Sequence, residues 1–120
     1  MKGPQRVFAG AAIYGALTLP PMYFMEARIA REAPPAVTHP EFFYGFISVG
    51  LACQVMFAVI ALDPKKYRLF MIPAMVEKFG YAATVFALAA AGRVAMPVPA
   101  FAGIDLLLGL SFAWAFTATR

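Results

Sequence analysis

Four long apolar stretches occupy most of this chain, at about residues 6–25, 42–62, 69–91 and 99–119. At a rise of about 1.5 Å per residue, a helix of about 20 residues crosses the roughly 30 Å hydrocarbon layer of a membrane. Hydrophobic residues make up 62% of the chain and charged residues 13%, against about 45 to 50% and 25% in soluble domains. The sequence therefore predicts an all-α integral membrane four-helix bundle, with residues 1–120 forming a single transmembrane domain.

The positive charges predict the orientation of this bundle. The cations divide unevenly between the two sides: Lys2, Arg6, Lys65, Lys66, Arg68 and Arg120 fall on one side, and Arg28, Arg31 and Arg93 on the other. Because the side richer in Lys and Arg stays in the cytoplasm, we expect an up-down-up-down bundle with both termini cytoplasmic. The long connection at 26–41 then faces outward, and its charge pattern predicts a short helix from Glu26 to Glu32.

Proline and the first apolar run add two expectations for the first span. Pro20 and Pro21 remove two backbone donors, so we expect the helix to be interrupted there. The run is longer than the apolar core of a signal peptide and no small-x-small cleavage site follows it. We therefore expect it to be retained as a membrane span.

Ionisable residues inside the spans are the main candidates for function. Glu77 and Lys78 lie about 12 to 14 Å below the predicted cytoplasmic edge, where each costs on the order of 2.5 to 3.5 kcal/mol unless it finds a partner, a proton or water. Gln54 and Glu77 are equally far from the turn between the second and third spans, so they are predicted to lie at one level and to pair. Tyr14 reaches a similar depth, and the charge state of Glu77 stays open.

Helical spacing predicts which face of the third span points inward. The spacings of three and four favour one shared polar face, made of Pro73, Glu77, Gly80, Tyr81, Thr84 and Leu88. Lys78 lies about 100° away from Glu77 around the helix. Three alternatives stay open for it: it reaches a neighbouring helix, extends toward the cytoplasmic rim, or meets another protein chain.

Asp105 in the fourth span has two predicted partners. A pair with Lys78 requires both side chains to extend, because their predicted levels differ by about 6 Å. The alternative is Thr18, or the carbonyl groups that Pro20 and Pro21 leave unbonded. Together these residues form a candidate intramembrane polar cluster, which is either a clasp that fixes helix register or a functional pocket: Tyr14, Gln54, Glu77, Lys78, Tyr81 and Asp105.

No other motif in the sequence predicts chemistry. There is no catalytic triad pattern, no phosphate-binding glycine loop, no metal-ligand cluster and no nucleic-acid-binding motif. His39 and Glu41 offer only two candidate ligands to a metal or lipid head group, and the single cysteine, Cys53, is expected to pack. We therefore expect a non-enzymatic protein with no cofactor, no bound metal and no nucleic-acid partner.

Two short stretches, His39–Phe46 (HPEFFYGF) and Asp63–Arg68 (DPKKYR), together with the length and the four-span layout, resemble small uncharacterised bacterial membrane proteins of DoxX-like size and layout. The resemblance implies a multi-pass protein of the bacterial inner membrane. It transfers no active site to this chain.

Three functions remain open from the sequence. The first is an accessory or scaffold subunit that packs in a larger membrane protein complex or a homo-oligomer, with lipids around it; the absence of catalytic motifs and the unplaced Lys78 favour it. The second is a binder or carrier of a lipophilic small molecule in a pocket lined by Glu77, Gln54, Tyr14, Tyr81 and Asp105. The third, a proton-coupled transporter, requires a homodimer to enclose a path.

Overall fold

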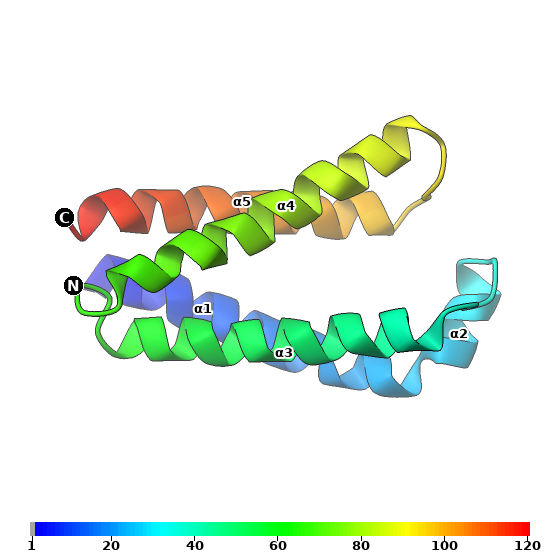
Figure 1. Ribbon diagram of the computed structural model, residues 1–120, viewed down its shortest axis with the longest axis horizontal. Helices are drawn as coiled ribbons and strands as arrows, with labels where there is room; N and C mark the ends of the chain where they lie inside the picture. Colours follow the sequence, from blue (N-terminus) through cyan, green and yellow to red (C-terminus); the bar gives the residue numbers. More distant parts are fainter. Residues whose placement is uncertain (1) are drawn as a thin grey trace.

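The computed structural model describes residues 2–120, which form helices and no β-strand. Four long helical segments run alternately up and down, and both termini lie at the same end (Figure 1). All four are long and apolar enough to cross a membrane, so the predicted all-α class with four spans is confirmed. The segments are α1 (Lys2–Thr18) continued by a 3₁₀ turn η1 (Pro20–Phe24), α3 (Pro40–Leu62), α4 (Met71–Ala90) preceded by η2 (Arg68–Phe70), and α5 (Val98–Ala118).

The observed helix bounds differ little from the predicted spans. When α1 and η1 are counted as one span, Lys2–Phe24, the largest difference is at its start, which lies at Lys2 instead of at residue 6. α3 begins at Pro40 instead of at residue 42 and ends at Leu62 as expected. Below, "the termini end" means the end of the bundle that holds both termini, and "the loop end" means the opposite end.

Proline and glycine explain where the helices begin and end. Pro40 and Pro99 lie in the first turns of α3 and α5, where the missing N–H would have no partner in the helix anyway. Pro20 ends α1 at Thr18, so the predicted interruption is present as a change to a 3₁₀ turn. α4 ends at Ala90, and Gly92 just after it has a φ of 72°, a conformation that glycine adopts without strain.

The short helix α2 (Glu26–Glu32) lies at the loop end, where the sequence predicts it. Arg28 and Glu32 form an ion pair along it, with Nε and Oε1 3.1 Å apart. The Tyr44 hydroxyl donates to the Glu26 carboxylate over 2.8 Å and so joins α2 to α3. Including this helix, the molecule is 45 Å long, which matches the roughly 40 to 45 Å of a bilayer with its head groups.

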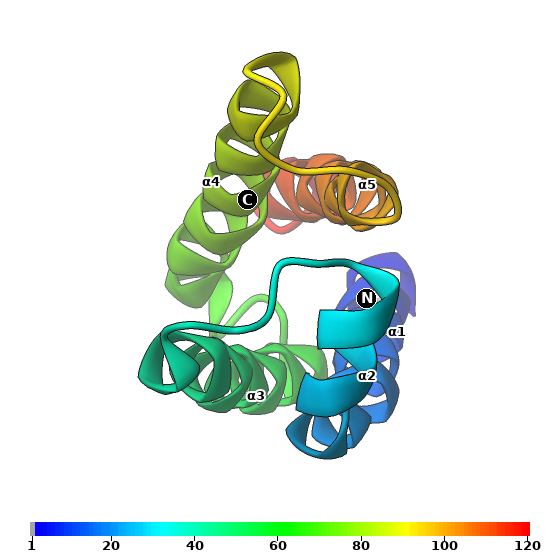
Figure 2. The same cartoon turned by 90° about the vertical axis from the view of Figure 1, so that its right-hand side faces the viewer.

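The four long helices form two tightly packed pairs. α1 packs on α3, and α4 packs on α5; Figure 2, from the loop end, shows the two pairs apart there. Gly109 of α5 lies so close to the Phe79 ring that a Cβ atom would be 2.8 Å from it. The contact between α3 and α4 is small, although the two helices are consecutive and were expected to form a hairpin with matching polar residues.

Large aromatic side chains join the two pairs at the termini end. Phe8 of α1 stacks on Phe112 of α5 with ring centroids 4.3 Å apart, and Phe57 of α3 meets Phe112 edge-on at 5.0 Å. All three rings are fully buried, as are Ile60 and Met71 beside them. Arg68 adds a polar contact here, because its Nε donates to the carbonyl of Phe116 over 2.9 Å. The bundle is therefore closed at this end.

Candidate functional site: an ion-pair triad at the base of a groove

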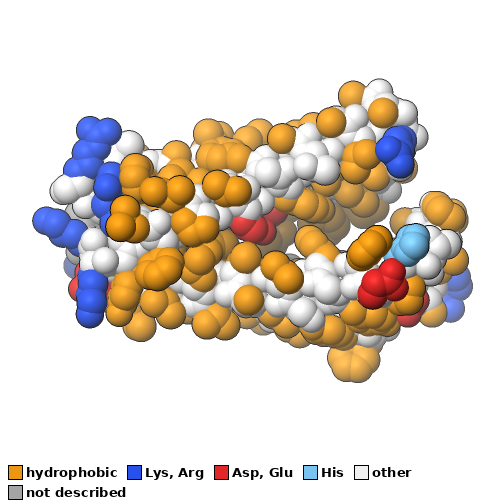
Figure 3. Space-filling view, viewed as in Figure 1, with side chains coloured by type: hydrophobic (Ala, Val, Ile, Leu, Met, Phe, Trp, Pro, Cys, Tyr) orange, Lys and Arg blue, Asp and Glu red, His pale blue; other side chains and the backbone are white. Residues whose placement is uncertain are grey.

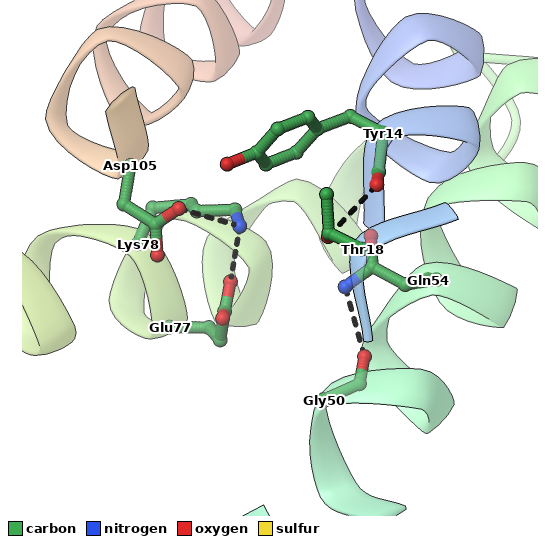
Figure 4. A network of polar contacts seen from close by, with 7 residues as sticks. All are labelled: Tyr14, Thr18, Gly50, Gln54, Glu77, Lys78 and Asp105. Atoms are coloured by element: carbon green, nitrogen blue, oxygen red, sulfur yellow. Dashed lines mark hydrogen bonds and ion pairs between the residues drawn. The ribbon is translucent and has the colours of Figure 1, made fainter. Parts of the chain in front are cut away.

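Three charged side chains meet in the middle of the bundle, and we call them the triad. They are Glu77 and Lys78 of α4 and Asp105 of α5 (Figure 4). The ammonium Nζ of Lys78 lies 3.3 Å from Asp105 Oδ1 and 3.4 Å from Glu77 Oε2. The Lys78 side chain is 5% exposed, against 14% for Asp105 and 28% for Glu77. Lys78 is therefore the buried centre of the triad, and Glu77 is its most open member.

The triad explains how the chain tolerates a buried lysine. An unpaired ammonium at this depth is costly, and removing one partner of a buried ion pair costs about 3 to 5 kcal/mol. Lys78 has two carboxylate neighbours, and its Nζ also lies 5.5 Å from the centroid of the Phe57 ring, within reach of a cation–π interaction. Of the three alternatives open for Lys78, the structure shows contact with a neighbouring helix, and the pair with Asp105 is present.

The inward face of α4 differs from the predicted one. The buried residues are Met71, Ala74, Lys78, Ala82 and Val85. On the predicted face, Pro73, Gly80 and Thr84 are exposed, and Glu77 and Tyr81 are half-buried. The prediction was wrong because it assumed that the most polar stripe packs inward. Packing against α5 instead buries the stripe of small and aliphatic residues, and Lys78 goes with it.

Gln54 does not pair with Glu77. It is buried, but its Nε2 donates to the carbonyl of Gly50 in its own helix over 2.8 Å, and its side chain lies against Gly15 of α1, where a Cβ atom would collide with it. Its Oε1 is buried without a hydrogen-bond partner among residues 2–120. The expectation of a pair assumed that α3 and α4 pack side by side, whereas α3 packs on α1.

The remaining candidate residues, Thr18, Tyr14 and Tyr81, also have different neighbours. Thr18 donates to the carbonyl of Tyr14 over 2.9 Å, so it is not the partner of Asp105. The Tyr14 ring, which is half-buried, points its hydroxyl toward Lys78 and Asp105 (Figure 4). Tyr81 instead stacks on Phe46 of α3 with centroids 5.9 Å apart. The residues of the predicted cluster therefore lie in three separate places. Glu77, Lys78 and Asp105 form the triad, Gln54 lies between α1 and α3, and Tyr81 lies between α3 and α4.

A groove of about 460 Å³ opens between α3 and α4. Figure 3 shows a recess between the two helix pairs, with acidic surface at its inner end. Of the predicted cluster, only Glu77 and Tyr81 line the groove. The α3 wall comes from one helical stripe, and with the two α4 residues the lining is Glu41, Phe42, Gly45, Phe46, Val49, Gly50, Cys53, Glu77 and Tyr81.

The α3 stripe was missed in the sequence, although it carries a signal. Its positions from Phe42 to Cys53 recur at spacings of three and four and so share one face. Gly45 on that face leaves room that a larger side chain would fill, whereas a Cβ atom on Gly50 would lie 3.0 Å from Leu19. The signal is a helix face that alternates aromatic and glycine residues, together with an acidic residue, Glu77, deep in the next span. The predicted packing role of Cys53 fits only in part, since it is half-buried and lines the groove.

The rim of the groove holds a second polar contact. His39 Nδ1 lies 3.0 Å from Glu41 Oε1, and both side chains are largely exposed. Within residues 2–120, no group of three or more His, Cys, Asp or Glu side chains is placed to hold a metal ion. These two residues form a solvated contact at the mouth of the groove.

Comparisons with protein-family models, with curated proteins and with solved structures found no match. The class of protein therefore rests on the fold. Four apolar helices of spanning length define a multi-pass integral membrane protein whose outer surface contacts lipid. The site within it consists of the triad and the groove.

Proposed function

We propose that this protein binds a lipophilic small molecule in the groove between α3 and α4. The observation that carries the proposal is the groove itself: about 460 Å³ of space with mostly apolar walls and the Glu77 carboxylate at its inner end. Sites for small molecules have volumes of about 300 to 1,000 Å³, apolar linings and a few placed polar groups. A molecule of moderate size could enter from the loop end or sideways from the lipid.

The sequence favours the accessory-subunit role, but the structure removes one of the arguments for it. Lys78 was the residue without a partner, and it now has Asp105 and Glu77 beside it in the same chain. The many exposed apolar side chains on the outer surface suit lipid as well as a protein neighbour. The accessory role stays a prediction, and the groove supports the proposal of a binding role.

Location enters the proposal as well. The cations at the termini end favour that end as the cytoplasmic one, and with the resemblance to small bacterial proteins this points to the inner membrane. The mouth of the groove, near Glu41, would then face away from the cytoplasm. Reaction of an impermeant reagent with a cysteine introduced at Glu32, in a Cys53→Ser background in intact cells, tests this orientation.

A variant that fills the groove tests the binding role. A Cβ atom on Gly45 meets nothing within 4 Å and Gly45 lines the groove, so Gly45→Leu adds a side chain that begins in open space beside the groove. Gly10→Leu is the matched control, because Gly10 is a helical glycine with equally open space that does not line the groove. The probe is N-phenyl-1-naphthylamine, a neutral lipophilic fluorophore, titrated into lipid nanodiscs with and without protein.

The proposal expects a saturable signal for the wild type and for Gly10→Leu. It expects the apparent affinity to fall about tenfold or more in Gly45→Leu, equivalent to about 1.4 kcal/mol of lost contact. Equal titrations for all three proteins, or no saturable signal above empty nanodiscs, would rule the groove out as a binding site for such molecules. Native pull-down of a stoichiometric membrane protein together with that result would favour the accessory role.

A further inference from the structure

The triad is unbalanced in charge. With its three groups ionised it holds two carboxylates, Glu77 and Asp105, and one ammonium, Lys78. In that state it carries one net negative charge in the middle of a membrane-spanning bundle, where a single charge is costly. A proton or a bound cation relieves that cost. The residues that line the groove include no Lys, Arg or His, and the acid at its mouth, Glu41, has the same sign.

The uncompensated charge is directed into the groove. Lys78 sits between its two partners and is almost completely buried. Glu77 Oε2, which faces Lys78, is buried. The Glu77 side chain as a whole is 28% exposed, and it lines the groove. The exposed part of Glu77 is therefore the side away from Lys78, where an incoming group can reach the carboxylate.

The walls next to Glu77 suit a cation. Tyr81 lies one helical turn from Glu77 on α4, and its ring stacks on Phe46 across the groove with centroids 5.9 Å apart. Phe42 is a further aromatic residue toward the mouth. Aromatic ring faces attract ammonium groups, and more strongly when water is excluded. The carboxylate at the base and the aromatic residues next to it favour positive charge over neutral groups.

We propose that the occupant of the groove is a lipophilic monocation, such as an amine or quaternary ammonium with an apolar tail. This rests on the proposed function and names its ligand class. The cationic head lies against Glu77 beside the stacked pair of Phe46 and Tyr81, and the tail lies along the Gly45–Val49 wall. An anion would add a third negative group to the site, and a neutral molecule would leave the net charge of the triad uncompensated.

Two probes that differ only in charge test this inference. They are radiolabelled trimethyl(4-phenylbutyl)ammonium and its carbon isostere (5,5-dimethylhexyl)benzene, in which a carbon replaces the nitrogen. Binding is measured to the full chain in lipid nanodiscs, with empty nanodiscs of the same lipids subtracted. The inference expects the cation to bind about tenfold or more tightly than the isostere, in line with one charge pair and a cation–π contact.

Variants at Glu77 separate charge from fold. Glu77→Gln removes the net charge and leaves the Lys78–Asp105 pair, so the preference for the cation should fall to about one, whereas Glu77→Asp keeps the charge and should retain most of it. Glu32→Gln removes an exposed acid on α2 and should change nothing. If Glu77→Gln does not fold, the Glu77→Asp variant and the wild-type ratio of the two probes still decide the question.

The outcomes distinguish this inference from the proposed function. Equal binding of both probes by the wild type, blocked by Gly45→Leu, would overturn the charge preference and leave the groove as a binding site. If Glu77→Gln still prefers the cation, the inference is also overturned, because a group other than the Glu77 carboxylate would then recognise the cation. Binding of neither probe would remove both proposals for ligands of this size.

Discussion

The two ends of the bundle are built from the same four helices but pack differently. At the termini end, Phe8, Phe57 and Phe112 fill the space between the helix pairs and are fully buried. At the loop end a groove remains between α3 and α4, and Gly45 of α3 lines it with nothing within 4 Å of its Cβ position. Close packing in one half holds the fold together and so permits an open, less packed half, which is where binding surfaces are usually found. Stability and binding are thus expected to respond to different substitutions.

The largest expected effect is the removal of an aromatic ring from the closed end. Phe112→Ala leaves a cavity among Phe8 and Phe57, and should lower the free energy of unfolding by about 3 to 5 kcal/mol. Unfolding in mixed micelles with increasing dodecyl sulfate measures it. Phe42→Ala at the loop end, where the ring is 69% exposed, is the matched control and should cost under about 1 kcal/mol. Equal losses would contradict the proposed division between the two ends.

The next effect concerns the triad, which lies between the two ends. Lys78→Met leaves two carboxylates facing each other without their cation and should lower the free energy of unfolding by about 3 kcal/mol. The double variant Lys78→Met with Asp105→Leu removes the second buried charge as well, and should recover most of that loss. The same unfolding assay applies. If the double variant is as unstable as the sum of its single changes, the two residues do not act as a pair.

The sequence predicts the spans and the depth of the polar residues, but not which of these residues are in contact. The spans follow from hydropathy alone, because a membrane leaves a long apolar segment little choice but to form a helix. The depth of Glu77 and Lys78 also follows, since rise per residue is fixed. The predicted pair of Gln54 and Glu77 was wrong because equal depth says nothing about which helices are neighbours, and α3 packs mainly on α1 and little on α4.

The groove could not be predicted from the sequence for a related reason. It arises from the divergence of two helix pairs, and that divergence depends on how the aromatic residues at the opposite end fill their space. The burial of Lys78 instead of Glu77 also depends on the neighbouring helix: Gly109 of α5 lies against Phe79 of α4, and small residues let helices approach closely. Such choices depend on pairs of helices, whereas periodicity describes one helix at a time.

A smaller effect is expected where α4 packs on α5. Gly109→Ala places a Cβ atom 2.8 Å from the Phe79 ring, so the ring or the helix must shift, and the free energy of unfolding should fall by about 1 to 2 kcal/mol. Gly103→Ala, on the same helix with nothing within 4 Å, should change it by under about 0.5 kcal/mol. No difference between the two variants would show that the α4–α5 contact is looser than described.

The smallest expected effect is at the loop end. Tyr44→Phe removes the hydrogen bond from the hydroxyl to Glu26, which joins α2 to α3, and should lower the local stability of α2 by about 1 kcal/mol. Hydrogen exchange of the α2 amides should become about fivefold faster, while exchange at the termini end stays unchanged. Unchanged exchange in α2 would mean that other contacts hold it in place.

The central claim, that the bundle is closed at one end and open at the other, is tested most directly by thiol reactivity. Cys53 lines the groove and is half-buried, whereas Ala115 is fully buried in the closed end. N-ethylmaleimide should modify Cys53 about tenfold or more faster than the thiol introduced by Ala115→Cys in a Cys53→Ser background. Filling the groove with Gly45→Leu should slow the reaction of Cys53. Equal rates at the two sites, or no effect of Gly45→Leu, would contradict the account.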